Sequence, residues 1–210
     1  MISLPVSIFV KYLKSKRTAQ LRQVKHREKK ENQIPFKYYR SAIAAIATYH
    51  RNGNDPSVFK NAKKTLLTKL ATCEKPGSAI IIKNNLRAID QYQMHFGTKH
   101  YIVRPVPKLK IVVGEITIST RADLCALQGD DLVLIRLDMT KKAGNRVEVE
   151  SLLSIIAEAA KSNGVKVKPM NVVCLRTEDG DEIQGHQLRR NEREAINLAS
   201  KEIAMMWGSL

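Results

Sequence analysis

The sequence predicts an α/β (α+β) fold in which basic helices precede a mixed β-sheet. The first 52 residues contain no glycine, and apolar residues recur at helical spacing as far as residue 96. From Tyr101 onward the chain is rich in β-branched residues, and turn signals separate short apolar runs. Charge changes at the same place: residues 1–110 contain 23 Lys and Arg against 5 Asp and Glu, whereas residues 111–210 contain 13 against 15. These observations predict two regions of different character.

Residues 1–100 are expected to form the basic helical region. Residues 7–32 have helical character, and a second helix fits residues 36–50. Asp55 is expected to cap a third helix over residues 56–72, because its side chain can accept a backbone N–H and Pro56 suits the first helical position. A fourth helix is expected over residues 78–96, although its Ala-Ile-Ile-Ile run could begin as a strand.

Residues 101–210 are expected to form a mixed-sheet core with the order β-β-β-α-β-α. Its first three strands are separated by turn residues and should form an antiparallel meander. The helical region and this core are expected to pack as one compact unit. The predicted strands are residues 109–118, 122–127, 132–139 and 165–175, and the predicted helices are residues 147–161 and 191–207.

The chemistry-bearing residues exclude several classes of protein. The three cysteines are far apart in the sequence, so neither a disulfide framework nor a zinc site is predicted. Cys125 and Cys174 lie within apolar runs and are expected to be buried thiols. The five histidines pair with no Ser or Cys in a recognisable order, so nucleophilic catalysis is not predicted either.

The opening run MISLPVSIFV is apolar but resembles neither a signal peptide nor a membrane span. Pro5 interrupts it, no basic residue precedes it, and it is shorter than the roughly 18 apolar residues that a span needs. We therefore expect no membrane partner and a cytoplasmic location, or a nuclear one in a eukaryote.

The segregated basic charge predicts a polyanionic partner, and nucleic acid is the commonest one. DNA is expected rather than RNA, and a protein complex is possible. Backbone contacts from Lys and Arg would dominate the affinity, and an aromatic ring among them could stack on a base. The residues expected to bind nucleic acid are Lys14, Arg17, Arg22, Lys25, Lys29, Lys30, Tyr38, Lys60, Lys63 and Lys64.

Two motifs in the second half resemble a known family. Thr120-Arg-Ala-Asp-Leu124 follows a predicted strand, and the apolar run 132–137 ends in Asp138-Met-Thr-Lys-Lys142. They resemble the "G-R-A-D-L" and "D-Y-K-T" steps of the PD-(D/E)XK nuclease superfamily, most closely its RecB-type exonuclease branch. The likeness covers about a third of the chain. It implies a nuclease-like core in which Asp123 is a metal ligand.

The chain departs from that family at the second carboxylate. The family chemistry uses two carboxylates to hold Mg²⁺ and a lysine two residues later on the same strand face. In the shorter register Arg136 occupies the carboxylate position and Asp138 the lysine position. In a register two residues longer Asp138 is the carboxylate, but Thr140 takes the lysine position. Lys141 is then one residue too far along, unless a bulge re-aims it.

Three functions stay open from the sequence. The preferred one is a nucleic-acid-binding protein whose catalytic site has degenerated, with Arg136 paired to Asp123 in place of a metal and no cofactor. The second is an active Mg²⁺-dependent DNA nuclease in which Asp123 and Asp138 bind the metal, Lys141 contacts the phosphate and Glu115 is a possible extra ligand. The third is a structural subunit whose basic helices dock on an acidic protein partner.

Overall fold

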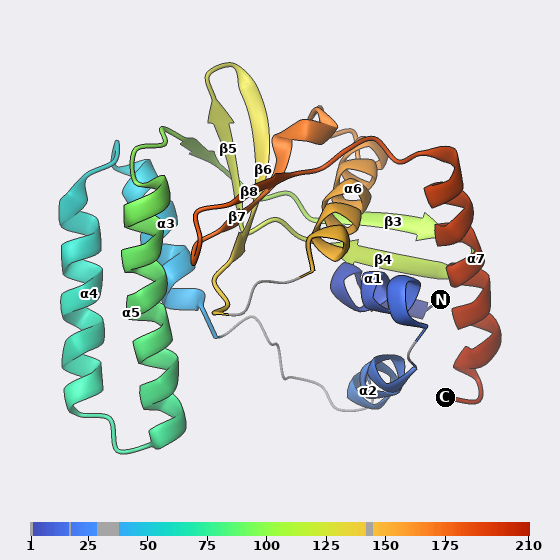
Figure 1. Ribbon diagram of the computed structural model, residues 1–210, viewed down its shortest axis with the longest axis horizontal. Helices are drawn as coiled ribbons and strands as arrows, with labels where there is room; N and C mark the ends of the chain where they lie inside the picture. Colours follow the sequence, from blue (N-terminus) through green and yellow to red (C-terminus); the bar gives the residue numbers. More distant parts are fainter. Residues whose placement is uncertain (1, 17, 29–37, 142–144) are drawn as a thin grey trace.

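The computed structural model describes residues 2–16, 18–28, 38–141 and 145–210, and its class is α+β with mixed sheets (Figure 1). Two sheets lie side by side, and helices cover their faces. In chain order the elements are β1 (Ile2–Pro5), α1 (Val6–Ser15), α2 (Ala19–Glu28), α3 (Arg40–Arg51), α4 (Pro56–Ala71), α5 (Pro76–Phe96), β2 (Ile102–Arg104), β3 (Leu109–Val113), β4 (Ile116–Thr120), β5 (Leu124–Gln128), β6 (Asp131–Asp138), α6 (Arg146–Ser162), a short 3-10 helix (Pro169–Asn171), β7 (Val172–Arg176), β8 (Glu182–Gln184) and α7 (Arg190–Trp207).

The larger sheet has the strand order β2-β5-β6-β7-β8. The first three strands are antiparallel, and β6 is parallel to β7 because helix α6 crosses over between them. Alternation along β6 sends Leu134 toward α6 and Ile135 toward α3 and α5. The sheet is therefore buried on both faces, and both halves of the sequence contribute to its core.

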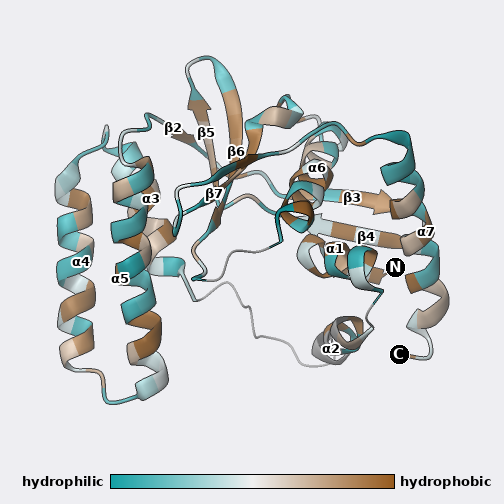
Figure 2. Ribbon diagram, viewed as in Figure 1, coloured by the Kyte–Doolittle hydropathy of each residue, from teal (hydrophilic) through white to brown (hydrophobic). Residues whose placement is uncertain are grey.

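The smaller sheet has the order β1-β4-β3. Strand β1 runs parallel to β4, with Ile2 opposite Ile116, and β3 and β4 form an antiparallel hairpin. Helices α1, α2 and α7 pack around it, and Phe9 and Ile203 are fully buried in this second hydrophobic cluster. The strands of both sheets are mostly apolar in Figure 2, as expected for buried strands.

The helices α3, α4 and α5 form the left-hand side of the molecule in Figure 1. The expected cap of α4 is present: the Asp55 carboxylate accepts the Ser57 N–H at 2.9 Å, and α4 begins at Pro56. The Ala-Ile-Ile-Ile run is helical, so its alternative as a strand is wrong. On α4, Phe59 and Leu66 are buried, whereas Leu67 is 54% exposed.

The first predicted helix, residues 7–32, is wrong in its extent. The chain forms strand β1 first, and α1 ends at Ser15 because Lys16 adopts a left-handed conformation with φ of 53°. Helix α2 then starts at Ala19. Neither proline nor glycine occurs between the two helices, so helical character alone could not locate this break.

The predicted strands also need correction. The strand over residues 109–118 is the β3–β4 hairpin, which turns at Gly114 with φ of 59°. The strand expected from residue 165 begins only at Val172, after the short 3-10 helix that Pro169 starts. The short strands β1, β2 and β8 were not predicted, since three or four residues give little periodicity.

The two cysteines expected to be buried are buried free thiols. Burial raises the pKa of Cys174 to about 12, so this thiol is unreactive near neutral pH. Among the described residues no helix is long and apolar enough to cross a membrane.

Candidate nucleic-acid interface

Asp123 and Arg136 face each other at the start of the β5–β6 ladder. Leu124 pairs with Ile135 in the antiparallel ladder. Asp123, which precedes Leu124, therefore lies opposite Arg136, which follows Ile135, on one face of the sheet. The Arg136 guanidinium lies 3.3 Å from the Asp123 carboxylate and donates to the Arg121 carbonyl at 3.0 Å. The Leu137 N–H also donates to this carboxylate at 2.9 Å. The predicted Arg136–Asp123 pair is therefore present.

The Asp123 carboxylate is almost completely enclosed. Its side chain is 4% exposed, and burial raises its pKa although Arg136, the Leu137 N–H and Arg121 act in the opposite direction. A carboxylate this deeply buried needs a cation beside it, and Arg136 supplies that charge. Arg136 thus neutralises Asp123 from within the chain.

Within the described parts of the chain, Asp138, Lys141 and Glu115 form no hydrogen bond or ion pair with Asp123. One Asp138 oxygen accepts hydrogen bonds from the backbone N–H and the hydroxyl of Thr140, at 3.1 and 2.6 Å, so this carboxylate caps the turn after β6. Lys141 is exposed beyond the end of that strand. Glu115 lies in the β3–β4 turn of the smaller sheet, at the far end of β4 from Asp123.

These residues do not fit a divalent cation. A Mg²⁺ ion prefers several oxygen ligands in octahedral geometry, and here a guanidinium stands beside the carboxylate that the resemblance assigns to the metal. Within the described parts of the chain no three His, Cys, Asp or Glu side chains form a group that could hold a metal ion.

A groove of about 670 Å³ opens beside Asp123, between α3 and the β2 side of the larger sheet. Its volume is that of a typical ligand site. Small or apolar side chains of α3, including Ala44 and Ala47, form part of its floor, and arginines stand around it. The lining residues are Arg40, Ile43, Ala44, Ala47, Thr48 and Arg51 of α3, and Val103, Arg104, Pro105, Val106, Arg121, Asp123 and Leu124 opposite them. We call this the arginine groove.

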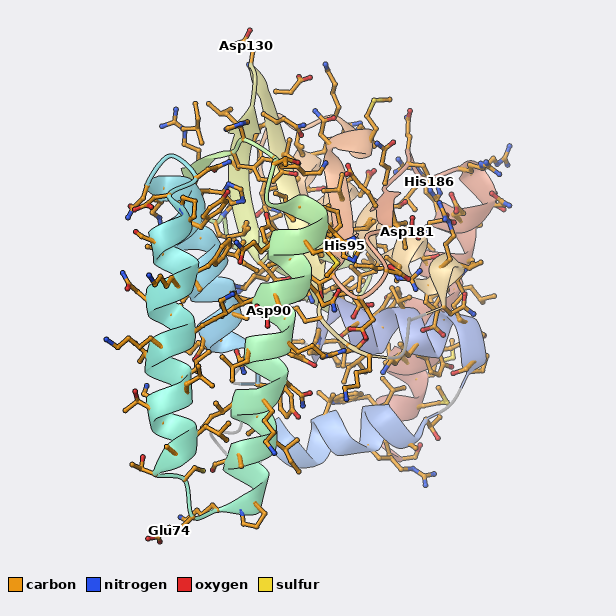
Figure 3. All side chains as sticks on the ribbon, turned by 60° about the vertical axis from the view of Figure 1, so that its left-hand side comes forward. Glu74, Asp90, His95, Asp130, Asp181 and His186 are labelled. Atoms are coloured by element: carbon orange, nitrogen blue, oxygen red, sulfur yellow. The ribbon has the colours of Figure 1, made fainter. Side chains whose placement is uncertain are left out.

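The charge of the arginine groove is strongly positive. Arg40, Arg51, Arg104 and Arg121 are all exposed, and the carboxylate in the lining, Asp123, is already paired with Arg136. Within residues 38–141 none of the ion pairs involves Arg40, Arg51 or Arg104. In Figure 3, Glu74 lies at the α4–α5 turn and Asp130 at the tip of the β5–β6 hairpin, and neither lines the groove. Exposed guanidinium groups of this kind bind phosphate well.

The basic residues predicted on the first two helices lie away from this groove. In Figure 1, α1 and α2 are on the right of the molecule, whereas α4 is at its left edge. Lys14 and Arg22 are exposed, but the Lys25 ammonium donates to the backbone carbonyls of Trp207 and Gly208 at the end of α7. Three of the predicted residues, Arg17, Lys29 and Lys30, lie outside the described residues.

The predicted residues near α4 are only partly available. Lys60 and Lys64 are exposed on its outer face, whereas the Lys63 ammonium forms an ion pair with Asp90 at 2.8 Å. Tyr38 is 36% exposed, and its hydroxyl accepts a hydrogen bond from Asn84 at 2.6 Å. The predicted residues thus lie on helices of two separate hydrophobic clusters, with α1 and α2 in one and α4 in the other.

One serine–histidine–glutamate arrangement was not foreseen from the sequence. The His186 ring lies 3.1 Å from the Ser154 hydroxyl through Nδ1 and 2.9 Å from the Glu192 carboxylate through Nε2. Ser154 is only 1% exposed. Its hydroxyl oxygen accepts the backbone N–H of His186, and its O–H donates to the Glu150 carbonyl at 2.8 Å. A nucleophile must be accessible to its substrate, and Ser154 is not. These hydrogen bonds therefore hold α6 and α7 together.

No protein-family model matches the chain, and no curated protein matches it either. The assignment of a function thus depends on the residues of the arginine groove. Sequence reasoning missed Arg40, Arg51, Arg104 and Arg121 as a group because they come from segments far apart in the chain. The helical spacing of Arg40, Ala44, Ala47 and Arg51 was the available signal, since it places both arginines on one face of α3.

Proposed function

We propose that this protein binds nucleic acid through the phosphate backbone, on a nuclease-like core whose acidic centre is neutralised by Arg136. The observation that carries the proposal is the arginine groove, in which exposed guanidinium groups surround an apolar floor next to the paired Asp123. Phosphate contacts of this type supply most of the affinity for nucleic acid and do not depend on base sequence.

The spacing of the arginines supports an extended anionic ligand. Arg40 and Arg51 stand at the two ends of one stripe on α3, and eleven residues of helix span about 16 Å. Arg104 and Arg121 face them from the opposite wall. Guanidinium groups spaced along both walls suit a chain of phosphates better than a single small anion.

Lysines outside the groove would extend the contact. Lys60 and Lys64 are exposed on α4, which packs against α3. With the four groove arginines they would give about six phosphate contacts. DNA is the expected partner, and the log–log dependence of affinity on salt should then have a slope of roughly −5.

The central experiment measures the anisotropy of fluorescein-labelled single-stranded and duplex DNA over a range of salt concentrations. Arg40→Ala should weaken binding by about tenfold and reduce the slope by about one. Arg190→Ala is the matched control, because this arginine of α7 is 94% exposed and far from the groove. Affinity that does not change with salt would contradict the proposal.

A second experiment separates binding from catalysis. The protein is incubated with labelled DNA and Mg²⁺ or Mn²⁺, and we expect retardation without cleavage because Arg136 occupies the acidic centre. Cleavage that Asp123→Asn abolishes would favour the nuclease with Asp123, Asp138 and Lys141. A failure to bind any polynucleotide at low salt would favour the acidic protein partner.

A further inference from the structure

A chain of hydrogen bonds lies directly behind the arginine groove, at the end of α3. The His50 Nδ1 atom lies 2.8 Å from the Asn54 Oδ1 atom, and its Nε2 atom lies 2.7 Å from the Tyr92 hydroxyl. The Asn54 amide nitrogen donates to the Lys99 carbonyl at 2.8 Å and lies 3.2 Å from the His100 Nδ1 atom. We call His50, Asn54, His100 and Tyr92 the histidine relay.

The Lys99 carbonyl determines which atoms of the relay carry protons. A carbonyl only accepts, so the Asn54 atom beside it is the amide nitrogen, and the Asn54 oxygen must face His50. His50 therefore carries a proton on Nδ1 and, when neutral, accepts the Tyr92 O–H on Nε2. The His100 Nδ1 atom faces an N–H donor and must also accept. The buried His50 ring is thus held in its neutral form.

A proton on His50 Nε2 or on His100 Nδ1 would remove a hydrogen-bond acceptor from the relay. His50 is 3% exposed, and burial lowers its pKa. On its own helix the nearest charge is Arg51. Tyr92 faces it from α5, and Tyr101 and His100 face it from the segment before β2. The Glu182 carboxylate of β8 is already paired with Lys99 at 2.6 Å, so the surroundings offer no free counter-charge among the described residues.

The arginine groove and a hollow lined by the relay share Arg51. Arg51 lines the arginine groove and also a second hollow of about 450 Å³, which His50, Asn54 and His100 line as well. Asn54, in a left-handed conformation with φ of 66°, ties the end of α3 to the segment that leads into β2. The relay therefore sets the position of α3 against the wall that carries Arg104.

We propose that the histidine relay makes binding in the arginine groove dependent on pH, with acidification releasing the end of α3 and weakening the affinity. This inference rests on the proposed function. Its direction is distinctive, because protonated histidines add positive charge and would by themselves strengthen phosphate binding. The direction of the pH effect follows because only the neutral His50 ring completes the relay. The relay is complete above the unfolded histidine pKa of 6.5 and is lost as the pH falls through the lower pKa of folded His50.

The test is the affinity for fluorescein-labelled DNA from about pH 7.5 to about pH 5 at constant ionic strength. Each pH unit below the transition should weaken binding by up to about tenfold. His50→Gln should abolish this dependence. Tyr92→Phe removes the O–H donor that favours neutral His50, so it should move the midpoint to higher pH and also serves if His50→Gln does not fold. His95→Gln, at an exposed position of α5, should behave as the native chain.

The outcomes separate the two proposals. Binding that is unchanged or tighter at low pH would overturn the relay and leave nucleic-acid binding intact. A midpoint that Tyr92→Phe does not move, or that His95→Gln removes, would overturn it as well. No binding at any pH, even at low salt, would overturn the proposed function and the relay with it.

Discussion

The arginine groove and the α1–α2 segment are both basic, but they use their charge in opposite ways. In the groove, Arg40 and Arg104 are exposed and form no ion pair among the described residues. In the α1–α2 segment, Lys16 pairs with Glu202 of α7, and Lys25 donates to carbonyls at the end of that helix. The first region has charge left for a ligand, whereas the second uses part of its charge to hold the fold together.

The difference shows that the charge of a segment does not locate a binding surface. Residues 1–110 hold all of the excess positive charge, yet the arginine groove takes Arg40 and Arg51 from one segment and Arg104 and Arg121 from others. Tertiary structure decides which cations remain available, because it brings each one to a carboxylate, to a carbonyl or to solvent.

The largest expected effect tests this comparison directly. Replacing Arg40, Arg51 and Arg104 together by alanine should raise the dissociation constant for DNA by about a thousandfold and reduce the salt slope by about three. The matched variant replaces Lys11, Lys14 and Arg22, which are exposed on α1 and α2, and should change the constant less than about fivefold. Anisotropy titrations measure both, and equal losses would break the comparison.

A smaller effect concerns the base of the groove. Arg136→Met leaves the enclosed Asp123 carboxylate without its cation and should lower the free energy of unfolding by about 3 kcal/mol. Adding Asp123→Asn removes the buried charge and should recover part of the loss. Urea unfolding measures both variants. A loss below about 1 kcal/mol for the single variant would show that the pair does not hold this site together.

The smallest effect belongs to the α1–α2 segment. Glu202→Gln removes the partner of Lys16, and because both side chains are partly exposed it should lower the unfolding temperature by no more than about 3 °C. The hydrogen bond from Lys16 lowers the pKa of Glu202, so this contribution is present at neutral pH and lost as the pH falls through that pKa. Thermal unfolding near neutral and acidic pH measures it, and DNA affinity should stay unchanged.

Strong local signals predicted much of the fold. The Asp55-Pro56 cap of α4, the helical spacing of α6 and the apolar run of β6 are each distinct enough to be recognised in the sequence. The strands β1, β2 and β8 lacked that length, and their existence depends on pairing with strands distant in the sequence. The break at Lys16 could not be predicted, because no proline or glycine marks it in the sequence.

The candidate site was predicted only at its centre. The resemblance placed Arg136 at the position of the second carboxylate, from which its pairing with Asp123 was expected, and the antiparallel pairing of β5 with β6 sets the two residues opposite each other. The arginine groove could not be predicted, since it depends on how α3 packs beside β2. Lys25 and Lys63 were assigned to a ligand because the sequence does not show that Trp207, Gly208 and Asp90 would bind them first.

The parallel pairing of β1 with β4 has a consequence for how the chain folds during synthesis. Residues 2–5 leave the ribosome before their partners, residues 116–119, which are made more than a hundred residues later, and α7 of the same cluster is made after both. Contacts of such long separation in sequence form slowly. Strand β1 therefore stays unpaired until β4 has been translated.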